Sequence, residues 1–330
     1  MEQSTTAAPR PRRKPAKPKT WNWRLYALVL LAILLVTAVI LRLTEKPAET
    51  VSAMDQLTEL AATAKASVAL PAGYHRQTMP DEALAQGTLV LVNNDCRFDP
   101  DTVTDLVSVY LNKTEHYEAK DWVLSVDPRV SDALNGWLEA GYAKNEFDSV
   151  NVVAGYRSYQ EQQTLYDNAV ASRGEEYAKQ YINQPGASEH HTGLAVDLSV
   201  IDRTGGTTDD FNGAGKQTWL REHAWEYGLI LRYPPEKVDI TGIDFESWHY
   251  RYVGLPHAQI IAENNLCLEE YIELLRQHPF DGEHPTGTCN GKPYDIYYCA
   301  GSRIVLPDDE NSYTISGNNV DGYIITIYAD

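Results

Sequence analysis

Histidine and acidic side chains gather in two short segments whose residue types suit metal chemistry. The first segment, residues 188–197, reads SEHHTGLAVD and holds two adjacent histidines and Asp197. The second, residues 246–249, reads ESWH and adds Glu246 and His249. Two imidazoles and one carboxylate are the protein ligands of an open zinc site, in which water takes the fourth position and a further carboxylate moves the proton. Together the segments predict a catalytic zinc site.

The ligands of such a site must come from separate elements, because the helical HExxH string is absent from the chain. Residues 194–200 alternate as a strand does, which places Asp197 on the face opposite the leucines and valines. A buried aspartate there needs a partner, and a metal is one. Gly193 allows a turn that brings His190 to the same point, although spacing alone leaves His191 equally eligible. A surface strand with solvated side chains also fits this segment.

The second segment requires a bend to serve the same site. Residues 247–253 predict a strand with its aromatic side chains on one face and His249 on the other. Glu246 comes three residues earlier, so a regular strand would point it away from His249. A bend near Ser247 would bring both side chains into one pocket. A satisfied core histidine is the alternative interpretation of His249.

Four segments resemble the signatures of one known family. SEHHTGLAVD resembles the SxHxxGxAxD signature of VanY-like D-alanyl-D-alanine carboxypeptidases, and ESWHYRYVG resembles their ExWH element. Residues 154–162, AGYRSYQEQ, are similar to the GYRS…Q segment of the family, and residues 89–93 are similar to its opening LVLVN strand. The resemblance covers residues 80–278 in the order that the family has.

The resemblance implies a zinc metallopeptidase with the fold of lysostaphin-type and hedgehog-type domains. That fold is a small antiparallel sheet flanked by helices, with zinc in a surface cleft. By motif position, one Zn2+ would be bound by His190, Asp197 and His249, and Glu246 would be the catalytic carboxylate. The motif thus selects His190, and leaves His191 beside the ligands.

The resemblance also implies a substrate, the peptidoglycan stem peptide ending in D-Ala-D-Ala, from which the terminal D-alanine is removed. Arg157 fits stabilisation of the developing oxyanion or a bidentate clamp on the terminal carboxylate. Ser188 and Gln162 would hydrogen-bond the C-terminal residue, whereas Ser158 suits a helix N-cap. The alternatives are an L,D-carboxypeptidase acting on tetrapeptide stems and a non-catalytic metal-binding cell-wall module. Glu246 argues against the module, because a structural zinc site needs no free carboxylate.

Charge is distributed unevenly along the 330 residues. The net charge is -18, yet residues 1–43 carry eight Lys and Arg against Glu2 alone. The strongly acidic remainder excludes nucleic acid as a partner. Residues 25–41 are uncharged and mostly aliphatic, between Arg24 and Arg42, which predicts a single membrane span with its basic N-terminal side in the cytoplasm. A cleaved signal peptide is the alternative.

These patterns predict five regions and an α+β fold, since strands and helices mix without regular alternation. The regions are a cytoplasmic basic tail (1–23), a transmembrane anchor (24–43), a stalk (44–79), an extracellular zinc carboxypeptidase domain (80–278) and a β-rich C-terminal extension (279–330). Expected strands are 87–93, 150–155, 194–200, 247–253, 312–316 and 323–328. Expected helices are 132–142, 160–172, 217–227, 256–264 and 268–277. The spacing of Cys289 and Cys299 favours a disulfide that staples a hairpin.

Overall fold

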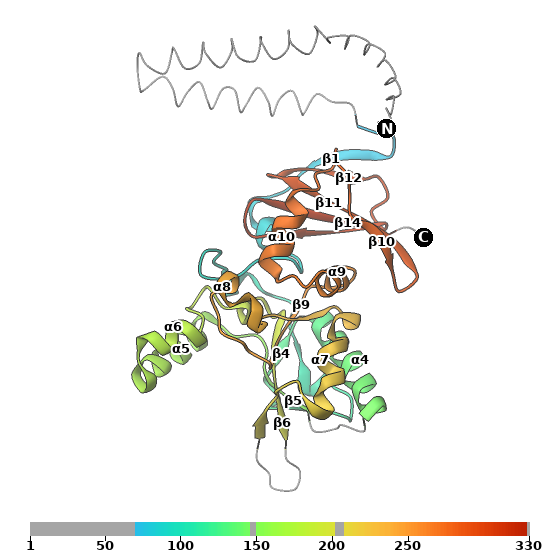
Figure 1. The fold of residues 1–330 in the computed structure, drawn as a ribbon. Coiled ribbons are helices and arrows are strands. Elements are labelled where there is room, and N and C mark those ends of the chain that lie inside the picture. Colours follow the sequence, from blue (N-terminus) through green and yellow to red (C-terminus); the bar gives the residue numbers. More distant parts are fainter. Residues whose placement is uncertain (1–69, 146–149, 202–207, 329–330) are drawn as a thin grey trace, which may run out of the picture. The chain divides into compact units, whose positions relative to one another are not determined.

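The computed structural model describes residues 70–145, 150–201 and 208–328 (Figure 1). The predicted cytoplasmic tail, the anchor and all but the end of the stalk lie outside the described residues. Within the described part, every helix is too short or too polar to cross a bilayer. The structure therefore bears on the expected carboxypeptidase domain and the C-terminal extension.

A small, mostly antiparallel sheet lies at the centre of the expected catalytic domain. Its strand order is β3-β5-β6-β9-β8, with β7 paired to β6. Only β3 and β5 run parallel. The bounds are β3 Glu118–Ala119, β5 Val150–Ala154, β6 Ala195–Ile201, β7 Thr208–Asp210, β8 Leu229–Leu231 and β9 His249–Tyr252. This sheet with helices around it confirms a fold that mixes helices with small sheets.

One side of this sheet packs on α4 (Pro128–Asn145) and α7 (Thr218–His223) in one hydrophobic core. The Trp137 indole of α4 is fully buried, donates to the Leu220 carbonyl at 2.9 Å and packs against Tyr250 of β9. The predicted helix 217–227 is in fact a run of three pieces, a 3-10 turn, α7 and a second 3-10 turn, and Gly228 ends it in the left-handed conformation.

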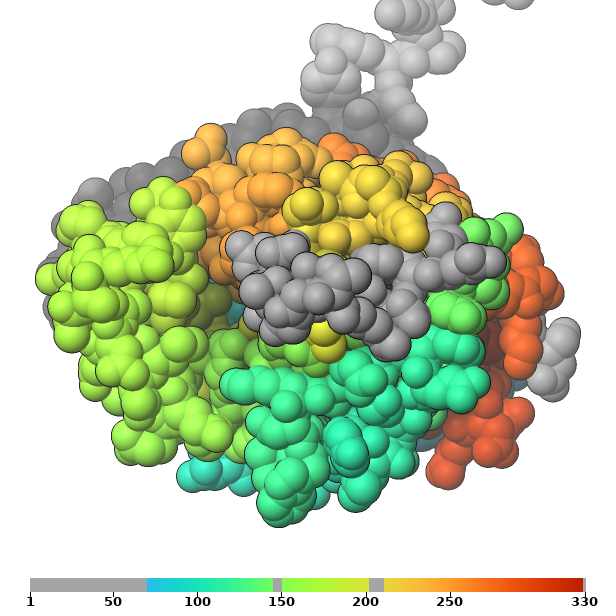
Figure 2. All heavy atoms as spheres, turned by 90° about the horizontal axis from the view of Figure 1, so that it is seen from below, coloured from blue at the N-terminus to red at the C-terminus, as the bar shows by residue number. Residues whose placement is uncertain are grey.

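Two further helices, α5 (Tyr159–Arg173) and α6 (Glu175–Tyr181), stand on the other side in Figure 1. Ser158 begins α5 with a capping box, because its hydroxyl accepts from Glu161 N–H while the Glu161 carboxylate accepts from Ser158 N–H. The N-cap expected at Ser158 is therefore confirmed. In Figure 2 these helices (yellow-green) form one side of the visible face, and the segments around β2 (Val107–Ser108), α3 (Val109–Asn112) and β4 (Ser125–Val126) form another.

The C-terminal part forms its own antiparallel sheet, in the order β10-β11-β14-β13. The hairpin expected around residues 317–322 is confirmed, since β13 and β14 pair as predicted. A two-strand ribbon joins β12 to β1, so residues 74–78, expected at the end of the stalk, pair with the C-terminal part. The bounds are β1 Tyr74–Thr78, β10 Thr286–Cys289, β11 Lys292–Ala300, β12 Arg303–Pro307, β13 Tyr313–Gly317 and β14 Gly322–Tyr328.

The helices α9 (His257–Glu263) and α10 (Leu268–Arg276) connect the two sheets. A second hydrophobic core forms between them and the C-terminal sheet, and includes Leu89, Leu91, Ile261, Leu268, Leu275, Ile296 and Ile324. His257 of α9 contacts the Tyr271 hydroxyl of α10 at 2.7 Å and Thr326 of β14 at 3.0 Å. The extension is thus packed onto the end of the catalytic domain.

The strand predicted over residues 87–93 is wrong. Leu89, Val90, Leu91 and Val92 are buried as a strand core would be, but the segment pairs with no strand. Its backbone N–H groups donate to acceptors outside any strand ladder. Leu89 N–H donates to the Ser316 hydroxyl, and Leu91 N–H donates to the Asn318 carbonyl. An apolar run predicts burial, but the pairing partner depends on distant parts of the chain.

The disulfide favoured between Cys289 and Cys299 is also wrong, because both cysteines are free thiols. In the β10–β11 hairpin, Cys289 lies opposite Lys292, whereas Cys299 lies opposite Tyr323 of β14. Cys299 is seven positions after Lys292 along β11, a distance of roughly 23 Å at ~3.3 Å per residue. A disulfide requires Cα atoms about 5.5–6 Å apart.

Candidate metal centre

The three predicted metal ligands converge on one point. One donor atom each from His190, Asp197 and His249 lie within 4.8 Å of one another. Asp197 bridges the two rings, since Oδ2 is 3.2 Å from His190 Nε2 and Oδ1 is 3.0 Å from His249 Nδ1. The side chains are at most 14% exposed. The geometric expectation for these residues is therefore met.

The sheet register explains why the ligands meet. Asp197 of β6 is directly opposite His249 of β9, so the two side chains leave the same face as neighbours. His190 lies on a short 3-10 turn, Glu189–Thr192, just before β6. Gly193 follows it with φ of 71°, a left-handed conformation that returns the chain into the strand.

Both ligand rings are oriented through the nitrogen that faces away from the cluster. His190 Nδ1 is 2.7 Å from the Gly155 carbonyl, which leaves Nε2 with its lone pair toward Asp197. His249 Nε2 is 3.4 Å from the Glu189 carboxylate, which leaves Nδ1 toward Asp197. Two imidazoles, each oriented by a partner at its outer nitrogen, and one carboxylate match the donor set of a catalytic zinc ion. These residues fit the metal.

His191, which spacing alone left eligible, has both ring nitrogens in other bonds. Its Nδ1 is 2.7 Å from the Arg157 carbonyl, and its Nε2 accepts from Gly186 N–H at 2.9 Å. The ring is fully buried. His191 therefore ties the two loops that flank the cluster, and His190 is the ligand candidate.

Glu246 lies beside the cluster because the chain bends where the sequence required it. Ser247 and Trp248 form a turn, and β9 begins only at His249. The Glu246 carboxylate is thereby 3.6 Å from His249 Nδ1. Burial raises the pKa of the Glu246 carboxyl to about 7, and the nearby Asp197 charge contributes in the same direction. A carboxyl that titrates near neutrality suits proton transfer.

Arg157 reaches the cluster from the turn before α5. Its Nη2 donates to Asp197 Oδ2 at 2.8 Å, and its Nη1 donates to Gln162 Oε1 at 3.3 Å. The Gln162 side chain is buried, and its Nε2 donates to the Asn183 carbonyl at 2.7 Å. Gln162 thus links Arg157 to the loop that leads to Ser188. The structure therefore brings Arg157 and Gln162 close to the cluster.

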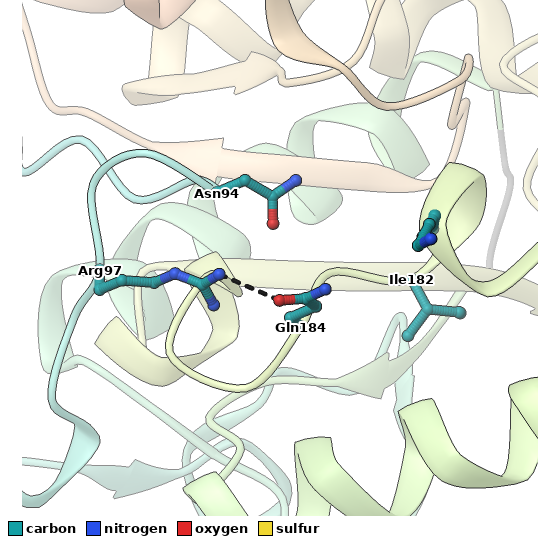
Figure 3. A pocket seen from close by; sticks show the side chains of 5 residues that line it. Asn94, Arg97, Ile182 and Gln184 are labelled. Atoms are coloured by element: carbon teal, nitrogen blue, oxygen red, sulfur yellow. Dashed lines mark hydrogen bonds between the residues drawn. The ribbon is translucent and has the colours of Figure 1, made fainter. Parts of the chain in front are cut away.

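Ser188 is buried at the start of the 3-10 turn that carries His190, and its side chain does not cap that turn. The preceding loop is held by Arg97, which donates to the Pro185 carbonyl at 2.9 Å and to Gln184 Oε1 at 3.0 Å. Arg97 and Gln184 border a cavity of about 340 Å³ (Figure 3), lined also by Asn94, Lys179 and Ile182. None of the metal-ligand candidates lines this cavity.

The charges around the cluster give its groups different proton affinities. Burial, with help from Arg157, lowers the pKa of His190 to about 4. Burial would also lower the pKa of His249, but its bonds to Asp197 and Glu189 outweigh burial and raise that pKa to about 9. In the metal-free protein His249 therefore holds a proton that metal binding must release.

Sequence reasoning missed a buried charge cluster behind His249, formed by Glu189, Arg232, Arg251 and Glu269. Glu189 accepts from Arg232 Nε at 2.8 Å and from Arg251 Nη1 at 2.6 Å. Arg232 also forms two bonds to Glu269 of α10, at 2.9 and 2.6 Å. Glu189 lies inside the SEHHTG segment and Arg251 inside ESWHYRYVG, but Arg232 and Glu269 lie in neither motif, so no local pattern connected the four residues.

Comparisons with known proteins identify relatives of this chain. The family model described as VanY, D-alanyl-D-alanine carboxypeptidase, matches residues 124–255. The D-alanyl-D-alanine carboxypeptidase of Enterococcus faecium is 32% identical over 266 residues, which is 76% of this chain and 78% of the relative. The bifunctional D-Ala-D-Ala dipeptidase and D-Ala-D-Ala carboxypeptidase VanXYC of Enterococcus gallinarum is 40% identical over 133 residues, which is 39% of this chain and 68% of the relative.

Among solved structures, the vancomycin resistance D,D-dipeptidase VanXYg, in complex with a D-Ala-D-Ala phosphinate analogue, superposes with a TM-score of 0.68 at 32% identity. The match covers 78% of this chain and 99% of that one. Identity and coverage at this level establish the family. The chain belongs to the VanY family of D-alanyl-D-alanine carboxypeptidases and is a zinc-dependent peptidase.

Proposed function

We propose that this site removes the C-terminal D-alanine from peptidoglycan stem peptides that end in D-Ala-D-Ala. The observation that carries the proposal is the position of Glu246, a buried carboxylate 3.6 Å from His249 Nδ1 and beside the three ligand candidates. A purely structural metal site needs no such group. The relative from Enterococcus faecium carries the same activity in its name.

The residues divide the chemistry as follows. Zinc, when bound by His190, Asp197 and His249, would polarise the scissile carbonyl and acidify a water toward a pKa of ~7. Glu246 accepts the proton of the attacking water and delivers it to the nitrogen of the departing D-alanine. A pKa of about 7 lets this carboxyl perform both transfers near neutral pH.

The guanidinium of Arg157 stabilises negative charge on the substrate. Its guanidinium already reaches Asp197 Oδ2, so a substrate beside the metal ligands lies within range of its other donors. We assign it to the oxyanion of the tetrahedral intermediate or to the terminal carboxylate. Gln162, which is bonded to Arg157, and the buried Ser188 complete the proposed pocket for the C-terminal residue.

We further propose that residues 24–43 anchor the chain in the cell membrane, with the part of residues 44–79 that precedes β1 as a stalk, residues 80–278 as the extracellular catalytic domain and residues 279–330 as its extension. The support is the uncharged stretch 25–41 and its basic N-terminal flank. Membrane fractionation of cells that express the full chain tests this. Recovery of the chain in the soluble fraction would contradict it.

An assay with synthetic stem peptides tests the activity. The zinc-loaded chain should release one D-alanine from a pentapeptide stem that ends in D-Ala-D-Ala, as followed by mass spectrometry, and a chelator should stop the release. Cleavage of the tetrapeptide stem alone would overturn the proposal in favour of L,D-carboxypeptidase activity. Zinc binding without cleavage of any stem would favour the non-catalytic wall-binding module.

The free dipeptide D-Ala-D-Ala belongs in the same assay as a second candidate substrate. The superposition on the D,D-dipeptidase VanXYg over 99% of its length favours that test. The ratio of kcat/KM for pentapeptide and dipeptide then states the preference directly.

A further inference from the structure

The Glu189 carboxylate connects the buried charge cluster to a metal ligand. Its Oε1 accepts from both Arg232 and Arg251, and its Oε2 faces His249 Nε2 at 3.4 Å. The side chain is fully buried although it lies next to the ligand His190 in sequence. A buried carboxylate with three donors on two oxygens has no freedom to rotate.

The two arginines are themselves fixed from behind. Arg251 Nη2 donates to the Thr88 carbonyl at 3.0 Å and to the Val90 carbonyl at 2.8 Å. Arg232 is held by Glu269 of α10 in a two-bond pair. The segment wrongly predicted as a strand therefore has a definite partner, since its carbonyls accept from the buried Arg251 guanidinium.

The charges of the cluster balance, because Glu189 and Glu269 oppose Arg232 and Arg251. Arg232 Nε and Arg251 Nη1 lie 2.8 and 2.6 Å from Glu189 Oε1, and these two cations keep Glu189 an anion where it faces His249. The other ligand ring, His190, has only the neutral Gly155 carbonyl in the equivalent position.

We propose that Glu189 is a positioning residue for His249, which fixes its Nε2–H tautomer and ring orientation and strengthens Nδ1 as a zinc donor. A carboxylate behind a ligand imidazole makes the ring more basic and holds it in place. Arg232 and Arg251 keep that carboxylate charged, and Glu269 extends its support to α10. The inference rests on the metal site of the proposed function, but not on the identity of the substrate.

A purely structural role for the cluster makes a different prediction, and Glu269 offers the matched control. Glu269 pairs with the same Arg232 and is likewise mostly buried, but it does not contact His249. Glu189→Gln keeps the shape of the side chain. Because a glutamine has a single acceptor oxygen, its NH2 group must face at least one of the donors that the Glu189 carboxylate accepts from. Glu269→Gln perturbs the same cluster without touching the ligand.

The test is zinc affinity of the full-length chain, measured by competition with a chromogenic chelator. Glu189→Gln should bind zinc about 10–100-fold more weakly, whereas Glu269→Gln should stay within about threefold of wild type. NMR of nitrogen-labelled histidine in the zinc-loaded proteins should show the His249 Nε2–H signal shifted in Glu189→Gln and unchanged in Glu269→Gln. Equal zinc affinities for the two variants would overturn the inference.

A double variant keeps the test valid if the uncompensated positive charge prevents folding. Glu189→Gln with Arg232→Met restores charge balance, and should still bind zinc about 10–100-fold more weakly than Arg232→Met alone. Equal affinity of these two proteins would likewise overturn the inference. Because affinity is measured without substrate, a wild-type chain that binds zinc but cleaves no stem peptide would refute the proposed function and leave this inference intact.

Discussion

Two glutamates flank His249, one near each ring nitrogen, and their surroundings assign them opposite roles. Glu246 lies 3.6 Å from Nδ1, and its burial raises the carboxyl pKa to about 7. Glu189 lies 3.4 Å from Nε2, and two buried arginines hold its pKa well below the ordinary value. One carboxylate can exchange a proton at neutral pH and the other cannot, so the environment rather than the residue type decides function.

The largest expected effect follows from removing the exchangeable carboxylate. Glu246→Gln should lower kcat on a pentapeptide stem by about 10²–10⁴-fold, because no other group beside the ligands takes up the proton. Zinc content should stay at one per chain. Steady-state kinetics with metal analysis measures both, and the exposed Glu222→Gln is the control. Full turnover by the Glu246 variant would transfer the role of base to another group.

The next effect concerns stability and separates the two glutamates. Glu189→Gln should lower the free energy of unfolding by about 3–5 kcal/mol, because it leaves a buried guanidinium without its anion. Denaturant unfolding of the metal-free proteins measures this, and Glu222→Gln should stay within about 0.5 kcal/mol of wild type. A loss under about 1 kcal/mol would show that Glu189 is not charged in the folded protein.

Glu246→Gln should change stability in the opposite direction. The folded pKa of about 7 lies above the ordinary value of 4.5, so the carboxyl stabilises the fold below about pH 4.5 and this contribution disappears as the pH rises through about 7. A neutral glutamine avoids that loss. The metal-free variant should therefore be more stable than wild type by about 1–3 kcal/mol at pH 8 and equal to it at pH 4. An unchanged difference across this range would contradict the raised pKa.

The smallest effect is the acid limb of activity. Since catalysis needs the Glu246 carboxylate ionised, kcat/KM should fall about tenfold for each pH unit below the limb. The limb should lie at or below about pH 7, because a bound dication favours the charged form. A profile of kcat/KM from pH 4 to 8 measures this. Activity independent of pH across this range would exclude Glu246 as the base.

The sequence was sufficient to predict those parts of the site that local patterns determine. Alternation along β6 placed Asp197 away from the core, and the three-residue spacing of Glu246 and His249 required the bend found at Ser247. Two predicted helix ends were also confirmed, the N-cap at Ser158 and the C-terminal glycine at Gly228. The choice between His190 and His191 needed the family signature, and then the bonds that occupy both nitrogens of His191.

Features that depend on distant contacts could not be predicted in this way. Arg232, Arg251 and Glu269 look like ordinary charged residues until the fold buries them against Glu189. The segment 87–93 has the composition of a strand, but its carbonyls serve Arg251. The spacing of Cys289 and Cys299 suggested a staple, although the register of β10 and β11 separates them.

Anomalous diffraction at the zinc edge, on crystals of the zinc-loaded chain, tests the central claim most directly. The account predicts one peak about 2.0–2.2 Å from His190 Nε2, His249 Nδ1 and an Asp197 oxygen, with Glu246 near it but not bound and Glu189 on the far nitrogen of His249. A peak coordinated by His191, by Glu189 or by none of these residues would contradict it.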